Sequence, residues 1–158
     1  MNMVLYEPDI PFNTGNVGRS CVATGSQLHL VGKLGFSLED KDVRRSGLDY
    51  WSSVDLHVHK DWETFLKEIG PQAALYFFSK KATQDFWSAA YQPDSYLVFG
   101  CETKGLPDTL LERYADKTYR IPMRENSVRS LNLSTAAGVV LYEALRQTKG
   151  LGLYAHHP

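Results

Sequence analysis

The chain has 158 residues, of which 22% are charged and 43% hydrophobic, and its formal net charge is −1. This length fits a single domain spanning residues 1–158, and the composition is close to that of ordinary globular proteins, so a disordered chain is excluded. The apolar runs are far shorter than the roughly 18 residues that cross a membrane, and we expect no secretory signal. Cys21 and Cys101 are therefore expected to be reduced thiols in a cytoplasmic protein.

Short apolar runs alternate with stretches of helical spacing, which is typical of an α/β domain with helices packed on a parallel sheet. Pro8 and Pro11 impose an irregular segment after the first strand, and Gly25 is a stop signal for the first helix. Strands are predicted over residues 3–6, 28–31, 54–58, 73–78, 96–99 and 118–121. Helices are predicted over residues 13–24, 38–45, 62–69, 83–91, 107–111 and 133–145.

Two of these helices have a clear amino-terminal signal, and the closing helix, residues 133–145, has the clearest periodicity of the chain. Asp61 and Thr83 are expected N-caps of the helices that follow them. In the closing helix, the apolar stripe from Leu133 to Leu145 is expected to face the core. Val139 and Tyr142 widen this apolar arc, which leaves room for a contact with a second subunit.

Several common functional sites are missing from the sequence. The first predicted strand is not followed by the glycine pattern of dinucleotide-binding folds, and neither a P-loop nor the serine elbow of α/β-hydrolases occurs. His57 and His59 lie two residues apart on a predicted strand without a Cys or His partner set nearby, so no metal is expected. His156 and His157 are interpreted as part of a solvated tail.

Three polar segments each follow the carboxyl end of a predicted strand, where open α/β sheets bind ligands. In the first, residues 13–19, helix-start amides and the guanidinium of Arg19 can form a phosphate site, although an ordinary helix cap with an exposed arginine also explains them. In the second, Gly100 and Gly105 let a ligand approach the backbone closely. Glu102 between them can accept a hydrogen bond from that ligand, or it can merely cap the following helix.

The third polar segment, residues 121–134, joins the last predicted strand to the closing helix. Ser130 and Asn132 can be plain N-caps of that helix, whereas Met123 and Leu131 can line an apolar pocket for a flat base. Three such segments on one sheet edge, without a metal or an obvious nucleophile, favour a group transfer whose chemistry a bound cofactor carries.

Taken together, the three segments resemble the signature motifs of the SPOUT methyltransferases. They resemble in particular the small single-domain subfamily that methylates the ribose 2'-hydroxyl of the wobble nucleotide, cytidine or uridine, in certain leucine tRNAs. The match extends from Leu5 to Ala144, and the run from Arg44 to Tyr50 also looks like this subfamily. The motifs that carry the resemblance are Asn13-Thr14-Gly15-Asn16 with Arg19, Phe99-Gly100 to Pro107, and Ile121-Pro122-Met123 with Ser130-Leu131-Asn132-Leu133-Ser134.

This resemblance implies a parallel α/β sheet with a deep trefoil knot near the carboxyl terminus. It also implies a homodimer whose active sites are completed across the subunit interface. The implied cofactor is S-adenosylmethionine, which leaves as S-adenosylhomocysteine. By the same resemblance, the residues that hold this cofactor are Phe78, Ser79, Gly100, Glu102, Gly105, Ile121, Met123, Ser130 and Leu131.

The implied reaction is attack of a ribose 2'-hydroxyl on the sulfonium methyl group, with Arg19, Asn13 and Asn132 as the catalytic residues. We expect Arg19 to orient the adjacent phosphate and to stabilise the developing alkoxide, because a guanidinium gives up its proton too reluctantly to act as a base. The partner is a tRNA anticodon stem-loop, without a membrane or a metal. Candidates for its phosphate contacts are Arg44, Arg45, Lys104 and Arg129.

Three alternatives remain open on the sequence. The chain can be a 2'-O-methyltransferase of the same class that acts on ribosomal RNA or on another tRNA position. It can be a non-catalytic RNA-binding or assembly factor with the same fold, although the presence of Arg19, Glu102 and Asn132 together argues against this. Without the resemblance, a doubly wound nucleotide-binding protein of the flavodoxin type is the best interpretation, and it predicts flavin colour in the purified protein.

Overall fold

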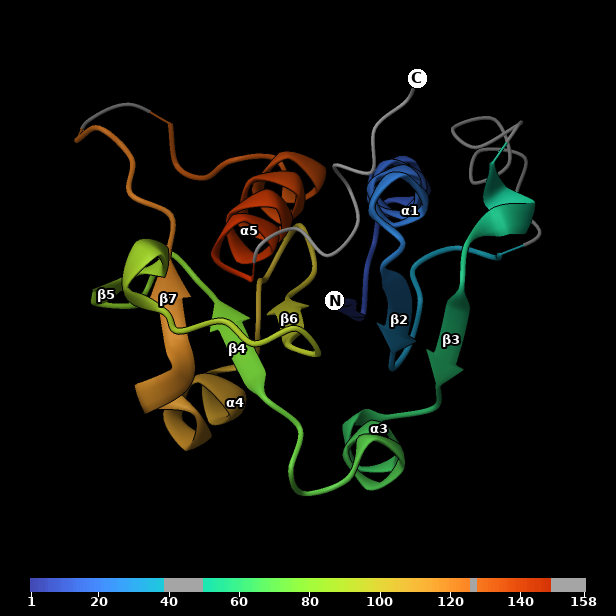
Figure 1. Ribbon diagram of the computed structural model, residues 1–158, viewed down its shortest axis with the longest axis horizontal. Helices are drawn as coiled ribbons and strands as arrows, with labels where there is room; N and C mark the ends of the chain where they lie inside the picture. The colour runs from blue at the N-terminus through green and yellow to red at the C-terminus, as the bar shows by residue number, and fades with distance from the viewer. Residues whose placement is uncertain (39–49, 126–127, 149–158) are drawn as a thin grey trace.

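The described part of the chain folds around a seven-stranded sheet in which all strands run in parallel (Figure 1). The computed structural model describes residues 1–38, 50–125 and 128–148. The strands span Asn2–Tyr6 (β1), Gln27–Val31 (β2), Leu56–His59 (β3), Leu75–Phe78 (β4), Gln84–Asp85 (β5), Tyr96–Phe99 (β6) and Thr118–Arg120 (β7). Their order across the sheet is β3-β2-β1-β6-β4-β7-β5. The chain thus builds one half of the sheet outward from β1 and then crosses over to the other half, and open α/β sheets generally bind ligands near such a crossover.

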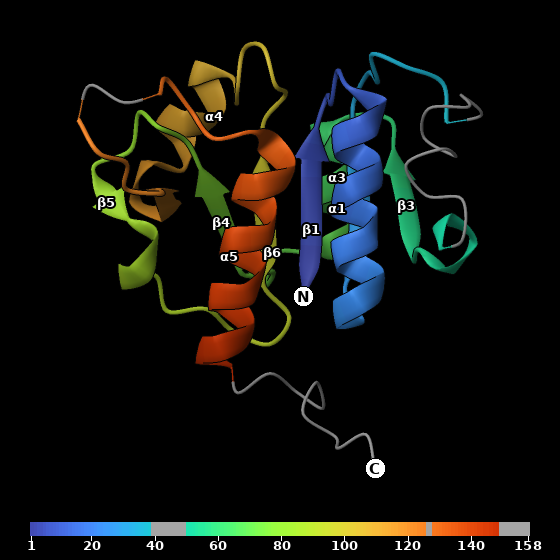
Figure 2. The ribbon, with the colours of Figure 1, turned by 90° about the horizontal axis from the view of Figure 1, so that it is seen from above.

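In the described ranges, four α-helices cover the two faces of this sheet (Figures 1 and 2). One face carries α1 (Pro11–Thr24) and α5 (Leu133–Gln147), which lie side by side, and the other face carries α3 (Trp62–Ile69) and α4 (Asp108–Arg113). Three short 3₁₀ turns lie in the connections: η1 (Trp51–Ser53), η2 (Phe86–Ser88) and η3 (Ala115–Lys117).

Helices on both faces explain why the central strands are apolar throughout. In β1, Met3 and Leu5 pack into the core under α1 and α5, whereas Val4 packs into the core on the opposite face, which also holds Phe65 of α3. Successive side chains of a strand point to opposite faces, so a strand buried on both faces consists mostly of apolar residues. The predicted core stripe of the closing helix is confirmed by the burial of Ala137, Val140, Leu141, Ala144 and Leu145.

The six predicted strands are all present, with ends shifted by no more than two residues. The predicted cap of α3 is also confirmed, because the Asp61 carboxylate accepts the backbone N–H of Thr64 at 2.8 Å. Gly25 ends α1 in the left-handed conformation, with φ of 64°, as its sequence position predicts. The helix predicted over residues 38–45 lies outside the described residues, apart from Leu38.

Two predictions about local structure are wrong. The helix expected after Thr83 is absent, and residues 84–88 form the edge strand β5 and the turn η2 instead. Phe86 is buried but Trp87 is 61% exposed, so the apolar spacing in this segment did not mark one face of a helix. The first helix begins at Pro11 rather than at Asn13, because proline fits the first helical position, where no N–H donor is needed.

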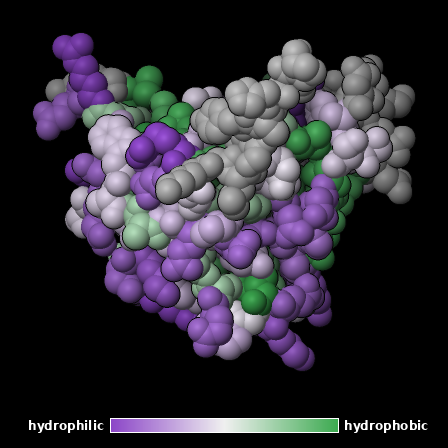
Figure 3. Space-filling view, in the orientation of Figure 1, coloured by the Kyte–Doolittle hydropathy of each residue, from purple (hydrophilic) through white to green (hydrophobic). Residues whose placement is uncertain are grey.

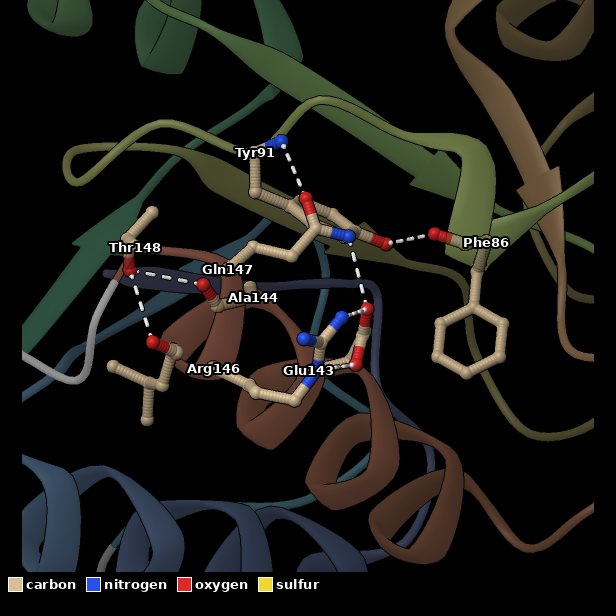
Figure 4. A network of polar contacts seen from close by, with 8 residues as sticks. Phe86, Tyr91, Glu143, Ala144, Arg146, Gln147 and Thr148 are labelled. Atoms are coloured by element: carbon tan, nitrogen blue, oxygen red, sulfur yellow. Dashed lines mark hydrogen bonds and ion pairs between the residues drawn. The ribbon is translucent and has the colours of Figure 1, made fainter.

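The carboxyl-terminal end of α5 is tied to the connection between η2 and β6 by a small polar network (Figure 4). The Gln147 side chain accepts the backbone N–H of Tyr91 at 3.4 Å and donates to Glu143 at 2.9 Å. Arg146 donates two hydrogen bonds to the same carboxylate, which lower the pKa of Glu143. The Tyr91 hydroxyl donates to the carbonyl of Phe86, and burial raises the pKa of this phenol. This network fixes the end of α5 that lies far from its N-cap.

On the face seen in Figure 3, the described residues show mostly hydrophilic surface with smaller apolar groups. In the view of Figure 3, hydrophilic side chains project over the segment that leads from β7 to α5. Val139 and Tyr142 on α5 are 41% and 56% exposed, as their place on the second apolar face of the helix predicts. Cys21 and Cys101 are both free thiols. Among the described helices, none combines the length and the apolar character needed to cross a bilayer.

Candidate functional site

A cavity of about 530 Å³ opens where β4, β6 and β7 reach their carboxyl ends, beside the start of α5. Its volume is in the range that holds a nucleoside-sized ligand. All three polar segments singled out in the sequence contribute to its wall. Of the residues predicted to be catalytic or to hold the cofactor, the wall contains Asn13, Phe78, Ser79, Gly100, Glu102, Gly105, Ile121, Met123, Ser130, Leu131 and Asn132.

The glycines of the second segment allow the chain to fold back on itself. A Cβ atom at Gly100 would lie 2.1 Å from the carbonyl carbon of Gly105 and from the backbone nitrogen of Leu106. Gly105 has φ of 72° and donates its N–H to the carbonyl of Cys101 at 2.9 Å. The segment is therefore a small loop, closed at its base, which requires glycine at both ends. We call residues 100–105 the cavity loop.

The wall combines aromatic, aliphatic and polar groups. The rings of Phe78 and Phe99, at the ends of β4 and β6, are stacked with their centroids 4.8 Å apart. Ile121 and Met123 follow β7 and add aliphatic surface, while Ser79 adds a hydroxyl group. A wall of this composition suits a ligand with a flat apolar part and a polar part, such as a nucleoside joined to an amino acid. The residues present therefore fit S-adenosylmethionine.

A network of hydrogen bonds joins the three segments at the cavity. Glu102 accepts the side-chain N–H of Asn13 at 2.9 Å, and its two carboxylate oxygens accept the backbone N–H groups of Asp9 and Ile10 at 2.8 and 3.3 Å. The Asn132 side chain donates to the side-chain oxygen of Asn13 at 2.9 Å. We call Asn13, Glu102 and Asn132 the loop network.

The network decides between the roles that the sequence left open for two of its members. Glu102 does not cap α4, since its carboxylate accepts from Asp9, Ile10 and Asn13, and the start of α4 has no side-chain cap. Asn132 is the N-cap of α5, because its side-chain oxygen accepts the backbone N–H groups of Ser134 and Thr135. Its amide nitrogen is directed at the loop network at the same time, so one side chain both starts the helix and joins the cavity wall.

Arg19 is the one predicted catalytic residue that does not line the cavity of its own chain. Its side chain is exposed on α1, and the guanidinium lies 4.7 Å from the centroid of the Tyr50 ring. The hydroxyl of Tyr50 donates to the carbonyl of Gly15 at 2.9 Å, so this ring is held against α1. Arg19 is thus placed on the helix that carries Asn13, but it is directed away from the loop network.

The cavity has a basic rim that the sequence analysis found only in part. Lys104 and Arg129, predicted to contact phosphates, both line it, whereas Arg44 and Arg45 lie outside the described residues. The structure adds Lys80 and Lys81, which were missed. Their position directly after β4 was the available signal, because the carboxyl ends of parallel strands meet at one edge. Lys81 pairs with Asp108 at 2.5 Å. The rim cations left for a phosphate are therefore Lys80, Lys104 and Arg129.

A second polar cluster lies away from the cavity, on β2 and β3. The ring of His29 stacks on that of His57 with 4.7 Å between centroids, and its Nδ1 lies 3.0 Å from Nε2 of His59. We call these three residues the histidine stack. Burial, together with the two neighbouring imidazole rings, lowers the pKa of His29 to about 3. Within the described ranges, no group of three or more metal-ligating side chains is arranged to hold an ion, the histidine stack included.

Comparison with known proteins places the chain among RNA methyltransferases. The model of the SpoU rRNA methylase family matches residues 1–142. A tRNA (cytidine(34)-2'-O)-methyltransferase of Saccharophagus degradans is 48% identical over 147 residues, which cover 92% of this chain and 94% of that relative. A solved structure that concerns the 2-OH methylation of C/U34 on tRNA is 44% identical, with a TM-score of 0.89, and the match covers 94% of this chain and 96% of the other. The SpoU methyltransferase AviRb of Streptomyces viridochromogenes, solved with the cofactor AdoMet, is 27% identical, with a TM-score of 0.78, over 93% of this chain and 60% of that one.

Proposed function

The chain belongs to the SpoU rRNA methylase family, and from this premise we propose that it methylates the ribose 2'-hydroxyl of nucleotide 34 in tRNA, with S-adenosylmethionine as the methyl donor. The observation that carries the proposal is the cavity at the carboxyl ends of β4, β6 and β7, to whose wall all three segments of the SPOUT motifs contribute. The names of several relatives and the AdoMet-bound structure of a more distant one support the reaction and the donor.

The finer substrate in this proposal is the anticodon loop of leucine tRNAs, with cytidine or uridine at the wobble position. The resemblance of the three motifs and of the run from Arg44 to Tyr50 supports this choice. The rim cations Lys80, Lys104 and Arg129 supply a local positive field in a chain whose net charge is −1. A tRNA substrate is in keeping with a cytoplasmic enzyme.

The chain's own contribution to the reaction is to position the reactants. When bound, the cofactor supplies an activated methyl group with a good leaving group, so no covalent intermediate with the protein is needed. Phe78, Gly100 and Leu131 belong to the wall that would hold it. The loop network fixes the wall relative to α1, and holding the reacting atoms in line supplies much of the acceleration. Arg19 would orient the phosphate beside the ribose and stabilise the charge that develops on the 2'-oxygen.

The position of Arg19 favours an active site shared by two subunits. Because Arg19 is exposed and lies outside its own cavity, we propose a homodimer in which Arg19 of the partner subunit completes the site. Exposed apolar side chains on the face formed by α1 and α5 offer a surface for such a dimer, namely Phe12, Val139 and Tyr142.

Subunit mixing tests this sharing directly. Arg19→Ala and Asn132→Asp chains are each expected to be nearly inactive. A shared site predicts that co-refolded mixtures regain about a quarter of the wild-type activity, because half of the dimers are mixed and each has one intact site. An active site within one chain predicts no recovery.

We also propose that residues 1–158 form one domain and that the segment after β7 threads a loop to form the trefoil knot of SPOUT proteins. The TM-score of 0.89 against a solved structure of a similar protein supports this topology. Knotted chains are very rare, so the topology depends on this likeness and not on the periodicity of the sequence.

The reaction itself is tested by incubating total tRNA with the protein and S-adenosylmethionine and mapping ribose methylation by mass spectrometry. We expect one added methyl group at position 34 of leucine tRNAs. The Arg19→Ala variant should lose turnover and keep its affinity for the cofactor. Methylation of ribosomal RNA or of another tRNA position would show that the proposed substrate is wrong. A flavin absorbance in the purified protein would instead support the nucleotide-binding alternative.

A further inference from the structure

The tip of the cavity loop is fastened to the segment that precedes α1. The base of this loop is closed by the contact between Gly100 and Gly105. Thr103 lies at the tip, and its hydroxyl donates to the carboxylate of Asp9 at 2.6 Å. This is the short distance of a hydrogen bond between a hydroxyl and an ionised acceptor, which is stronger than one between neutral groups. The loop is therefore held both at its base and at its tip.

A second contact beside the first makes the connection reciprocal. Asp9 accepts from the side chain of Thr103 and donates its own backbone N–H to Glu102, the neighbouring residue of the loop. The N-cap of α1 is Ile10, whose side chain cannot cap the helix, and its N–H also binds Glu102. The cavity loop thus supplies the hydrogen-bond acceptor for the two backbone N–H groups that directly precede the first turn of α1.

We propose that Thr103 and Asp9 are positioning residues that couple the cavity loop to α1, so that a cofactor bound at the loop fixes the place of Asn13 in the active site. The proposal rests on the function proposed above, since it assigns the cofactor to this loop. Neither residue stands out in the sequence, because each is a common polar residue in a loop, and their partnership spans 94 positions of the chain.

The physical reason for such a fastening is the freedom of the loop. Glycine at each end gives the loop more accessible conformations than other residues would. Thr103 is exposed and Asp9 is partly exposed, so the loss of their hydrogen bond should leave the core intact. What changes is how firmly the loop and the start of α1 move together. A defect confined to this coupling is the signature of positioning residues.

The test uses the full-length Thr103→Val variant, which keeps the shape of the side chain and removes its hydroxyl, and Thr103→Ser, which keeps the hydroxyl. Hydrogen exchange of the peptide that contains Asp9 and Ile10 is followed with and without S-adenosylhomocysteine. In the ligand-free protein, we expect Thr103→Val to speed this exchange about fivefold or more, whereas Thr103→Ser matches the wild type. Thr109→Val, at an exposed position on α4, is the matched control and should change nothing.

With the ligand, exchange at the start of α1 should slow in the wild type and in Thr103→Ser, and much less in Thr103→Val. In the methylation assay, we expect Thr103→Val to lower kcat about tenfold and the affinity for the ligand by less than about threefold. The double variant with Asp9→Ala should add little further loss, because both changes break one contact.

Unchanged exchange in ligand-free Thr103→Val, or equal defects in the Val and Ser variants, would overturn the coupling. A wild-type protein that methylates no tRNA, while Thr103→Val still loosens the start of α1, would instead contradict the proposed function and leave the fastening in place. The exchange measurement needs no tRNA, so the two failures can be told apart.

Discussion

The loop network and the histidine stack are both groups of three polar side chains, but they are assembled in different ways. The members of the loop network come from three segments distant in the chain, bind one another through hydrogen bonds of 2.9 Å, and border the cavity. The histidine stack lies on the neighbouring strands β2 and β3, packs against aromatic rings, and contributes no residue to the cavity wall. We therefore expect substitutions in the loop network to lower activity, because its geometry depends on the whole fold. We expect substitutions in the histidine stack to change stability.

The largest effect on the cavity side is expected from Gly100→Ala. The new methyl group would lie 2.1 Å from the backbone of Gly105, and backbone atoms cannot move aside as the end of a flexible side chain can. The cavity loop would have to open, which we expect to cost about 3 kcal/mol or more in the free energy of unfolding. Binding of S-adenosylmethionine, measured by calorimetry, should become undetectable.

Gly138→Ala is the matched control for this variant. A Cβ atom at Gly138, in the middle of α5, meets no atom of the described residues within 4 Å, apart from its chain neighbours and the backbone of its own helix. Alanine is the better helix former, so its free energy of unfolding should be equal to or up to about 1 kcal/mol above that of the wild type. Wild-type affinity for the cofactor in Gly100→Ala would show that the cavity loop does not need its closed base.

The next effect separates the two roles of Asn132. Asn132→Asp keeps the oxygen that caps α5 but places a second acceptor opposite the side-chain oxygen of Asn13. The amide of Asn13 cannot turn to compensate, because its N–H binds Glu102. We expect kcat to fall about 100-fold while the melting temperature stays that of the wild type.

Asn132→Ala is the companion variant, since it removes the cap as well. It should lose about 1 kcal/mol in the free energy of unfolding in addition to the loss of turnover. Equal stability of the Asp and Ala variants would mean that the cap contributes nothing. Full activity of Asn132→Asp would remove the loop network from the catalytic argument.

These contrasts also explain which parts of the fold the sequence could predict. Strands such as β6 and helices such as α3 have signals within their own residues, namely apolar runs and the cap at Asp61, so they were placed correctly. The segment after Thr83 was misjudged because the same apolar spacing fits a helix and a bent edge segment. Only pairing with β7, which lies more than 30 residues later in the chain, decides between the two.

The candidate site, like the fold, could be predicted from the sequence only in part. Glycines and polar residues after strands marked the segments of the cavity, because the rule for parallel sheets is local in sequence. The bonds from Glu102 to Asp9 and Ile10, and the placement of Arg19 outside the cavity, depend on how segments about 90 residues apart meet. No spacing in the sequence carries that information, and the knot implied by the resemblance is a further step of the same kind.

In the histidine stack, His29 should make the folded protein less stable in acid. The pKa of this buried ring is lowered to about 3, whereas an unfolded histidine titrates near 6.5. Below pH 6.5 the unfolded state therefore binds more protons than the folded state, and stability falls as the pH drops towards 3. The slope of the free energy of unfolding, measured with urea between pH 7 and 5, should approach but not exceed about 1.4 kcal/mol per pH unit from this group.

His29→Asn should flatten that slope, because asparagine keeps a polar group near the position of Nδ1 but does not titrate. His57→Gln is the matched control, as it alters the exposed edge of the histidine stack and leaves the buried ring in place, so most of the slope should remain. Cofactor affinity over the same pH range should be the same in His29→Asn and in the wild type. A steep slope that persists in His29→Asn would place the acid sensitivity elsewhere.

The smallest effect is expected from the cap of α3, the helix that packs on the sheet face opposite α1 and α5. The Asp61 carboxylate binds the N–H of Thr64, and this bond lowers the pKa of Asp61 below its ordinary value of 3.8. Asp61→Ala should lower the melting temperature by about a few degrees, whereas Asp61→Asn, which can still accept that N–H, should lower it much less. Both variants should methylate tRNA at the wild-type rate, since α3 contributes no residue to the cavity wall. A loss of turnover in Asp61→Ala would mean that the two faces of the sheet are coupled, and the separation of function from stability drawn above would have to be given up.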